Sequence, residues 1–524
     1  MIKTIHLSRI IIYKDFFWLK YLPLYLILIF HVAAWFVLKP VWPFADDYCY
    51  AFDAFKFNTE ELKLSYDQFQ NRFGVYLPAA FLFKMFGITP YTISLWPLIA
   101  SCFTIALIYI FLDKLINSPV AILSSCLIAT NVLQVTYSIA LFPDLIVSMY
   151  AIAAILILYR RTTANNIRCA ILFPVVISLG LITKETIMMI FPFVIVILIL
   201  DLIKKDHLYF WRITALSSIA TATVFFLTYW IITGDPLHLV KTMIDFNNNR
   251  LMDQENADIL KSMFNTNIFS WLNNNLGLIF LLIFSVPSFV SIQKLQNNFK
   301  SFITLYSVVL LVLMLVLFHT EKYGAVFLQP RIWMLLIAPL SILSALIIYE
   351  DSRRSLLILF VLFLVFSIIN LPSVSLARSL LYFSFPLIIG SLLLFKHPKA
   401  HLLILVPFII LSINFVVGNS NFHFASARSG NNLKYELEFL NRSGKKTILS
   451  AEDFALNHII YNGFREYENL TFFPFSKIDS LAGKQDLYVI VNNEETSIPE
   501  FISGDSASWS TILNHNKIQI FRKK

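Results

Sequence analysis

The chain has 524 residues, of which 58% are hydrophobic and only 14% are charged, and its mean hydropathy is +0.71. A soluble globular protein of this size does not have such a composition, whereas a polytopic membrane protein does. The net charge is +9, but the Lys and Arg residues cluster in short loops between apolar spans. That distribution indicates membrane topology and argues against a nucleic-acid-binding surface.

The cysteines argue against a disulfide-rich or zinc-binding protein, and the N-terminus argues against a cleaved signal peptide. Three of the four cysteines lie in or beside apolar spans, and none forms a CxxC pair; the four are Cys49, Cys102, Cys126 and Cys169. Neither a disulfide framework nor a zinc site is therefore indicated. The N-terminus has no short apolar region followed by a small-residue cleavage site, so we expect the first span to be retained as an anchor.

Apolar runs long enough to cross a bilayer, roughly 17–25 residues each, recur over the first four-fifths of the chain. About thirteen are expected, with the run at 169–182 the shortest and least certain to span. They lie near 19–38, 91–112, 119–137, 142–159, 169–182, 186–203, 213–233, 276–292, 301–318, 332–349, 355–370, 379–395 and 402–418.

The basic loops predict the orientation of these spans. The basic residues lie in loops that all fall on the same side of the membrane when the spans are counted in order. They are Lys3, Arg9, Lys14 and Lys20, then Arg160, Arg161 and Arg168, then Lys204, Lys205 and Arg212, and further pairs up to Lys396 and Lys399. The positive-inside rule assigns this side to the cytoplasm, which places the N-terminus inside. The opposite side then holds the first loop (39–90), a loop at 234–275 and everything after about residue 419.

These three outer pieces differ in character. Within the first loop, residues 72–87 are apolar but too short to span, which is typical of a segment that lies along the membrane interface. The loop at 234–275 is Asn-rich and charged, and its length suits either a mobile lid or a plain connector. After residue 419, short strands near 446–450, 486–491 and 518–521 and an amphipathic stretch at 434–440 predict a small α/β domain (419–524) following the membrane domain (1–418).

An acidic pair follows the first span directly, in the stretch Trp42-Pro43-Phe44-Ala45-Asp46-Asp47-Tyr48-Cys49-Tyr50. Charge is costly at that depth, so Asp46 and Asp47 are candidate functional residues, with Tyr50 as a neighbouring candidate. The alternative is that Asp46 merely caps the helix that follows.

Other unusual charges fall on the same predicted side, at the outer ends of spans. They are Arg72, Asp144, Lys184, Glu185, Glu321, Lys322 and Arg331. A carboxylate can deprotonate an attacking hydroxyl or amine, while Lys and Arg hold a phosphate leaving group and stabilise its growing charge.

Each of these residues also has a structural alternative. Arg331 opens an apolar span and is expensive there unless it meets an anion, but that anion can be Glu321 in a structural salt bridge. Lys184 can lie on a solvated turn between short spans. Asp144 can be the N-cap of the fourth span, because Pro143-Asp144 is a good helix start.

Taken together, these residues resemble the GT-C glycosyltransferases that use polyprenyl-phosphate-linked sugars, most closely the branch of aminoarabinose-lipid A transferases and protein O-mannosyltransferases. Members of that group have an outer loop that begins with an acidic pair and contains an interfacial segment ending in Phe-Gly. The matching stretches here are 44–50, Phe83-Lys84-Met85-Phe86-Gly87, Ala140-Leu141-Phe142-Pro143-Asp144, 181–185 and Gln329-Pro330-Arg331-Ile332-Trp333 with Pro339. The resemblance covers most of the membrane part. It rests on the order of these short motifs along the chain and on the side of the membrane where they are expected.

The resemblance implies roles for individual residues. The first acid of the pair, Asp46, would be the general base, with Asp47 as its neighbour. Arg72 would contact the lipid phosphate by position, although the family pattern has a Lys followed by prolines where this chain has Arg72-Phe73-Gly74. The family's Arg-Tyr before the late span appears here as Arg331-Ile332.

We therefore expect a polytopic all-α, GT-C-like protein of a bacterial inner (plasma) membrane, with its C-terminal α/β domain periplasmic or extracellular. Its predicted activity is inverting transfer of a hexosyl or pentosyl group from a polyprenyl-phosphate donor to a lipopolysaccharide, O-antigen or other cell-envelope glycan or lipid. The alternatives are a transporter or lipid flippase, which usually shows repeats and Gly/Pro-broken helices, and a surface-polysaccharide polymerase or ligase. No cofactor is assured; Asp46 and Asp47 offer oxygen ligands to a divalent cation, but two acids alone make a poor cage for it.

Overall fold

A computed structural model gives the fold. It describes residues 20–38, 40, 46–59, 69–162, 167–250, 276–290, 299–318, 330–350, 353–370 and 384–389. Within the C-terminal part it describes 437, 440–442, 445–450, 468–474, 477, 487–492, 502, 508–515 and 518–523.

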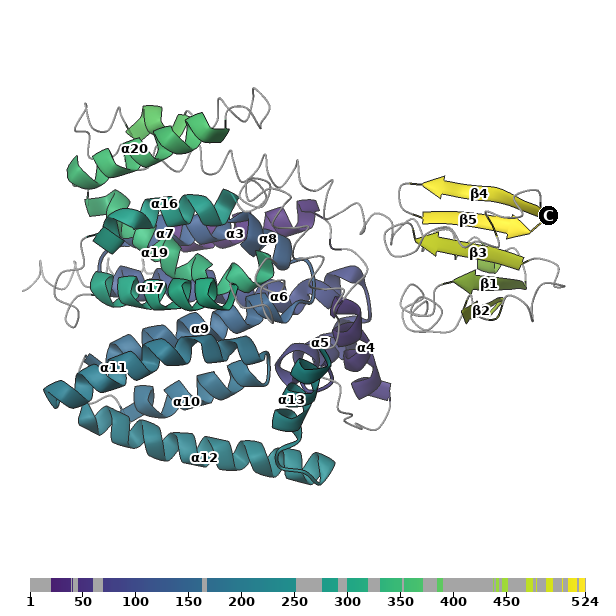
Figure 1. The fold of residues 1–524 in the computed structure, drawn as a ribbon, viewed down its shortest axis with the longest axis horizontal. Coiled ribbons are helices and arrows are strands. Elements are labelled where there is room, and N and C mark those ends of the chain that lie inside the picture. Colours follow the sequence, from purple (N-terminus) through teal and green to yellow (C-terminus); the bar gives the residue numbers. More distant parts are fainter. Residues whose placement is uncertain are drawn as a thin grey trace, which may run out of the picture.

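The described part of the first 390 residues is almost entirely helical and forms a bundle (Figure 1). Its α-helices are α3 (Leu22–Leu38), α4 (Asp46–Thr59), α5 (Phe73–Phe86), α6 (Pro90–Leu115), α7 (Ser118–Ala129), α8 (Val132–Tyr137), α9 (Pro143–Tyr159), α10 (Ile167–Leu181), α11 (Phe191–Lys204), α12 (Leu208–Thr233), α13 (His238–Arg250), α16 (Leu276–Val290), α17 (Phe299–Phe318), α19 (Met334–Glu350) and α20 (Arg353–Asn370). Three 3-10 helices accompany them: η1 (Arg160–Thr162), η2 (Glu185–Ile190) and η3 (Pro330–Trp333).

Six helical stretches of the described chain are long and apolar enough to cross a membrane. They are Pro90–Leu115, Pro143–Thr162, Glu185–Lys204, Leu208–Thr233, Phe299–Val316 and Arg331–Tyr349. The last is 94% buried and packs against α7, α9, α16 and α17, so α19 forms the centre of the bundle. Leu208–Thr233 is only 6% buried, which places α12 at the edge, where its apolar side chains are free to face lipid.

Each of these six stretches coincides with one of the expected spans, and another expected span needs a correction. A single span was expected at 119–137, but the chain breaks after Ala129 and restarts as α8. The side chain of Asn131 accepts hydrogen bonds from the backbone N–H groups of Leu133 and Gln134, so it starts the new helix as an N-cap. The total of about thirteen spans stays a prediction, because the run at 402–418 and most of the run at 379–395 lie outside the described residues.

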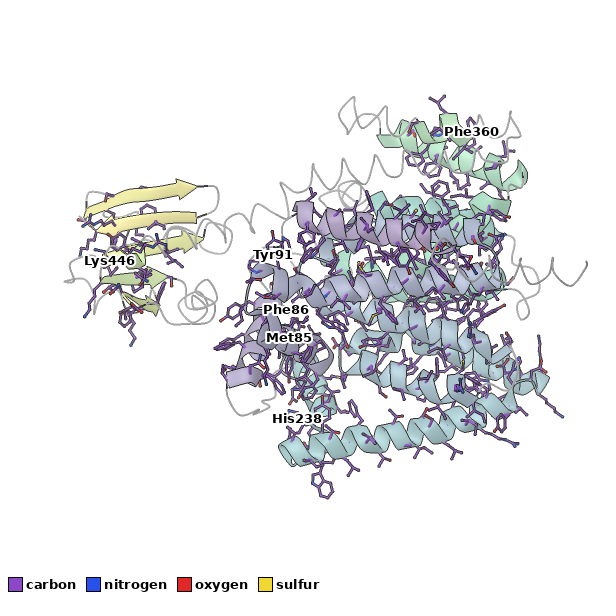
Figure 2. All side chains as sticks on the ribbon, turned by 180° about the vertical axis from the view of Figure 1, so that it is seen from behind. Met85, Phe86, Tyr91, His238, Phe360 and Lys446 are labelled. Atoms are coloured by element: carbon purple, nitrogen blue, oxygen red, sulfur yellow. The ribbon has the colours of Figure 1, made fainter. Side chains whose placement is uncertain are left out.

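Helices α4, α5 and α13 lie at one end of the bundle (Figure 1). Helix α5 is the predicted interfacial segment, and the side chains of Phe81, Met85 and Phe86 are more than half exposed on it (Met85 and Phe86 are labelled in Figure 2). An exposed apolar face of this kind suits a helix at a membrane interface.

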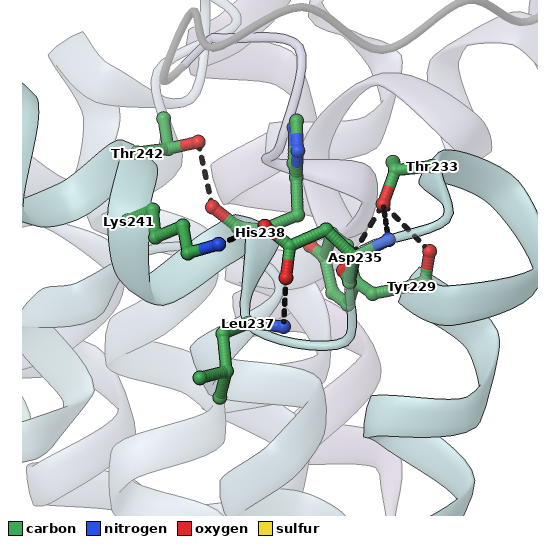
Figure 3. Close-up of polar contacts among 7 residues, drawn as sticks. All are labelled: Tyr229, Thr233, Asp235, Leu237, His238, Lys241 and Thr242. Atoms are coloured by element: carbon green, nitrogen blue, oxygen red, sulfur yellow. Dashed lines mark hydrogen bonds and ion pairs between the residues drawn. The ribbon is translucent and has the colours of Figure 1, made fainter.

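Helix α13 falls in the loop for which a lid or a connector was expected. It follows a tight corner after α12, where Asp235 accepts a hydrogen bond from the N–H of Leu237 and pairs with Lys241 at 2.6 Å (Figure 3). The ring of His238 stacks on Tyr229 of α12, with centroids 6.2 Å apart. These contacts fasten the start of α13 to the end of α12.

A five-stranded sheet forms the C-terminal part, in the order β2-β1-β3-β5-β4. Its strands are β1 (Lys446–Ser450), β2 (Leu470–Pro474), β3 (Leu487–Asn492), β4 (Trp509–His515) and β5 (Ile518–Lys523). Strand β1 runs parallel to β2 and β3, whereas β5 is antiparallel to β3 and β4. The three expected strands are confirmed as β1, β3 and β5, while β2 and β4 were not expected. The domain limits at residues 418 and 419 stay a prediction.

Candidate functional site

The start of α5 packs closely against the turn between α10 and η2. The N–H of Gly74 donates to the carbonyl of Ile182 at 2.9 Å, and a Cβ atom on Gly74 would lie only 2.1 Å from the hydroxyl of Thr183. The indole of Trp96 donates to the carbonyl of Gly74 at 3.0 Å from the other side. Only glycine fits this position, and the close contact brings Arg72, the N-cap residue of α5, beside Lys184 and Glu185.

Arg72 is held by two side chains from different elements. Its guanidinium donates to both carboxylate oxygens of Glu185, at 2.9 and 3.1 Å, and to the phenolic oxygen of Tyr50 on α4. Burial lowers the pKa of Arg72, but Glu185 and Tyr50 outweigh burial and leave the pKa above its ordinary value. The side chain is therefore a fixed positive charge that is 7% exposed.

Lys184 and Asp144 form a second buried pair. The ammonium lies 2.5 Å from one carboxylate oxygen of Asp144, in the first turn of α9, and both side chains are almost fully buried. Burial lowers the pKa of Lys184, against the opposing effect of Asp144. Lys184 thus does not lie on a solvated turn. Nor is Asp144 the N-cap of its helix, because Phe142 occupies that position and makes no side-chain cap bond.

Arg331 joins this group from η3, more than 140 residues further along the chain. Its guanidinium lies over the ring of Phe142, 5.4 Å from the centroid, and its charge acts on both Asp144 and Lys184. The structure therefore brings five of the predicted residues together, and we call them the charged cluster: Arg72, Asp144, Lys184, Glu185 and Arg331.

The acidic pair lies in the first turn of α4, with Asp46 as the first helical residue. Asp47 is 6% exposed, and Tyr50 follows it by three residues and is completely buried. Residues three apart lie on one face of a helix, so the face that carries Asp47 is the face whose Tyr50 contacts Arg72. The side chain of Asp46 and the whole of Glu321 and Lys322 lie outside the described residues, so the predictions for them stay predictions.

The charges of the cluster suit an anionic ligand. Among these five described residues three are cations and two are carboxylates. The first turn of α4, which carries Asp46 and Asp47, lies beside them. Guanidinium and ammonium groups in a poorly hydrated site bind phosphate strongly. In the described part of the chain, no group of three or more His, Cys, Asp and Glu side chains converges as a metal site.

Sequence reasoning missed the residues that hold the cluster in place. Gly74 and Trp96 position Arg72, and Phe142 lies beneath Arg331, but nothing in the composition distinguishes them from ordinary packing residues. The hydroxyl of Tyr229 likewise donates to the carbonyl of Asn71, next to Arg72, across 158 residues of sequence. Contacts of such long range leave no local pattern.

Comparison with known proteins relates the sequence and the fold to those of membrane glycosyltransferases. Residues 73–230 match the family model of dolichyl-phosphate-mannose-protein mannosyltransferases. No curated protein sequence matches the chain. Among solved structures the chain is similar to ArnT from Cupriavidus metallidurans in the apo state, with a TM-score of 0.63 and 10% identity over 95% of this chain and 97% of that one.

Two further structures show the same likeness. ArnT from Cupriavidus metallidurans bound to undecaprenyl phosphate gives a TM-score of 0.60 at 8% identity, over the same shares of the two chains. The oligosaccharyltransferase of Archaeoglobus fulgidus in the apo form gives 0.51 at 13% identity, over 92% of this chain and 70% of that one. The predicted resemblance is confirmed as a likeness: the chain has an ArnT-like fold, and residues 73–230 match the mannosyltransferase family model.

Proposed function

We propose that the protein transfers a sugar from a polyprenyl-phosphate donor to a cell-envelope glycan or lipid. The charged cluster would bind the donor phosphate through Arg331, Lys184 and Arg72, and the acidic pair on α4 would activate the acceptor. The observation that supports the proposal most directly is the convergence of three buried or half-buried cations beside that acidic turn. A similar protein, ArnT, is known bound to undecaprenyl phosphate.

The proposed reaction is a displacement at the anomeric carbon with inversion. Asp46 takes the proton of the acceptor hydroxyl or amine while the acceptor atom forms its bond to the sugar. The bond between the anomeric carbon and the phosphate oxygen breaks, and its electrons stay with that oxygen. The donor, a phosphodiester with one negative charge, thereby becomes a lipid monophosphate with a second negative charge. Arg331 and Lys184 stabilise this added charge as it develops.

Asp46 is the better candidate for the base because it is the first residue of α4 and the first acid after span α3, which would fix its position. Asp47 is buried on the face of Tyr50 and would support Asp46 by electrostatics or by capping the helix. For the acceptor we propose a glycan or lipid outside the cytoplasm, in line with the positive-inside rule applied to the basic loops. The same rule places the C-terminal domain on the outer face of the membrane, which we propose is a bacterial inner membrane.

The test uses purified protein in detergent, a radiolabelled sugar on its polyprenyl phosphate, and membrane lipids as acceptors. Asp46→Asn keeps the size of the side chain but removes its charge and basic lone pair, so transfer should fall at least about 100-fold while donor binding persists. Asp47→Asn should cost less.

Near-normal transfer by Asp46→Asn would overturn the assignment of the base. Loss with Asp47→Asn alone would move that role by one residue and leave the reaction class intact. Absence of transfer by the wild-type protein from any polyprenyl-phosphate sugar, combined with no binding of polyprenyl phosphate, would contradict the proposed activity itself.

A further inference from the structure

A polar network lies inside the helical bundle, apart from the charged cluster, and the proposed reaction does not use it. His31, in the middle of α3, is completely buried, and both of its ring nitrogens are engaged. Nδ1 lies 3.0 Å from the carbonyl of Ala129, and Nε2 lies 2.7 Å from the hydroxyl of Ser101 on α6. The amide of Gln134 on α8 donates to the same hydroxyl at 2.8 Å.

The pattern fixes the tautomer of a neutral histidine. A carbonyl only accepts, so Nδ1 must carry the hydrogen that is donated to Ala129. Nε2 then accepts from the hydroxyl of Ser101, which in turn accepts from Gln134. The chain of bonds is complete with a neutral imidazole, as a site in the interior of a membrane bundle requires.

The network secures the break between α7 and α8. Ala129 is the last residue of α7, and Gln134 lies in α8, so the bonds of His31 and Ser101 reach both sides of the break. Trp35, four residues after His31 and on the same face of α3, donates its indole N–H to the carbonyl of Ser138 at 3.1 Å. Helix α3 therefore binds the chain immediately before α8 and again immediately after it.

Helix α8 leads directly to the residues beneath Arg331. Tyr137 ends α8 and lies edge-on to the ring of Phe142, with centroids 5.8 Å apart, and Phe142 carries the guanidinium of Arg331 over its face. Helix α8 also contacts η3, the short helix to which Arg331 belongs. A shift of α8 would therefore move the aromatic surface on which Arg331 rests.

We infer that His31 and Trp35 are positioning residues for Arg331 and, through it, for an anionic lipid phosphate. This inference rests on the proposed function, because it takes the charged cluster as the phosphate site. The two side chains act by fixing the break before α8 and the end of α8; they do not touch the substrate. The alternative is that these hydrogen bonds hold the helices together and do nothing more, as such bonds often do inside a membrane bundle. The test must therefore separate binding of the donor from stability of the protein.

The experiment measures equilibrium binding of undecaprenyl phosphate to the full-length protein by titration in native mass spectrometry, together with the melting temperature. His31→Leu removes both bonds of the imidazole, and Trp35→Phe removes only the bond to Ser138. Both should raise the Kd about tenfold, the loss expected when a charge-assisted contact to phosphate is misaligned. His31→Gln should bind as the wild-type protein does, because a side-chain amide offers a donor and an acceptor in place of the two nitrogens.

The control is a network of the same kind that lies away from the charged cluster. Arg161 pairs with Asp201 at 2.7 Å, both side chains are buried, and the indole of Trp211 donates to the same carboxylate at 2.8 Å. Trp211→Phe should lower the melting temperature and leave the Kd unchanged. An equal loss of binding in Trp211→Phe would overturn the inference, because it would make the effect one of general stability.

The remaining outcomes are also decisive. Wild-type affinity in folded His31→Leu and Trp35→Phe would contradict the positioning role while leaving the proposed function intact. If His31→Leu does not fold, Trp35→Phe and Ser101→Ala decide in its place. If the wild-type protein binds no undecaprenyl phosphate, the proposed phosphate site fails first, and the inference with it.

Discussion

At the scale of single residues, the charged cluster is held by mutual neutralisation. Glu185 and Tyr50 hold Arg72, and Asp144 holds Lys184, so both of these cations are paired before any ligand arrives. A buried charge without a partner is strongly destabilising, and Glu185 and Asp144 remove that cost for Arg72 and Lys184. Arg331 is held differently, over the face of Phe142, and its guanidinium is half-buried. We therefore expect Arg331 to make the contact to phosphate that depends most on geometry.

This expectation leads to a prediction for Arg331→Lys. An ammonium keeps the charge but loses the planar fork that binds two phosphate oxygens, so the donor KM should rise about tenfold. Arg160→Lys is the matched control, because Arg160 also lies over an aromatic ring, that of Phe111 at 5.7 Å, apart from the cluster. Steady-state transfer kinetics check both variants. An unchanged KM in Arg331→Lys, or an equal rise in Arg160→Lys, would contradict the assigned role.

At the scale of elements, the site depends on how closely α5 approaches the turn before η2. Gly74→Ala places a methyl group 2.1 Å from the hydroxyl of Thr183 and about 3 Å from its backbone, which forces the two segments apart. Overpacking of this kind costs about 1–3 kcal/mol of stability. Because Arg72 and Glu185 lie on opposite sides of the contact, the donor KM should rise as well.

Two further variants test this prediction. Gly74→Ala combined with Thr183→Ala removes the worst clash and should recover part of the donor affinity. Gly87→Ala forces an alanine into a positive-φ conformation (φ 76°) at the end of α5, where a Cβ meets nothing within 4 Å, so it should lower the melting temperature but not raise the KM. The measurements are thermal unfolding and transfer kinetics. A Gly74→Ala protein with wild-type KM would show that the close contact does not position the site.

The elements also show what the sequence could and could not predict. Hydrophobic runs predicted the six long apolar helices of the described chain to within a few residues, because a helix that crosses a membrane is apolar along most of its length. The break after Ala129 was missed because the apolar run resumes directly after Thr130 and Asn131, so two polar residues were counted as part of one span. The charges at helix ends were found because charge is conspicuous in an apolar chain. Their pairing, such as Lys184 with Asp144, needed the fold, because 40 residues separate the partners.

At the scale of the whole molecule, the C-terminal sheet and helices α4, α5 and α13 lie toward the same end of the bundle (Figure 1). The basic loops predict that this end is outside the cytoplasm, where a lipid-linked donor and an envelope acceptor would meet. An alkaline phosphatase reporter fused after Lys524 should therefore be active in cells, whereas a fluorescent reporter that folds only in the cytoplasm should be dark. The opposite pair of results would reverse the orientation and remove the proposed acceptor from reach of the site.

The central claim is that the charged cluster binds the phosphate of a polyprenyl donor beside the acidic turn of α4. The most direct test is an experimental structure of the full-length protein with undecaprenyl phosphate bound in a lipid environment. The account predicts phosphate density within hydrogen-bonding distance, about 2.7–2.9 Å, of the Arg331 guanidinium and of Lys184 or Arg72, with Asp46 facing the same space. Density for the phosphate at any other place, or an Arg331 side chain that faces lipid, would contradict it.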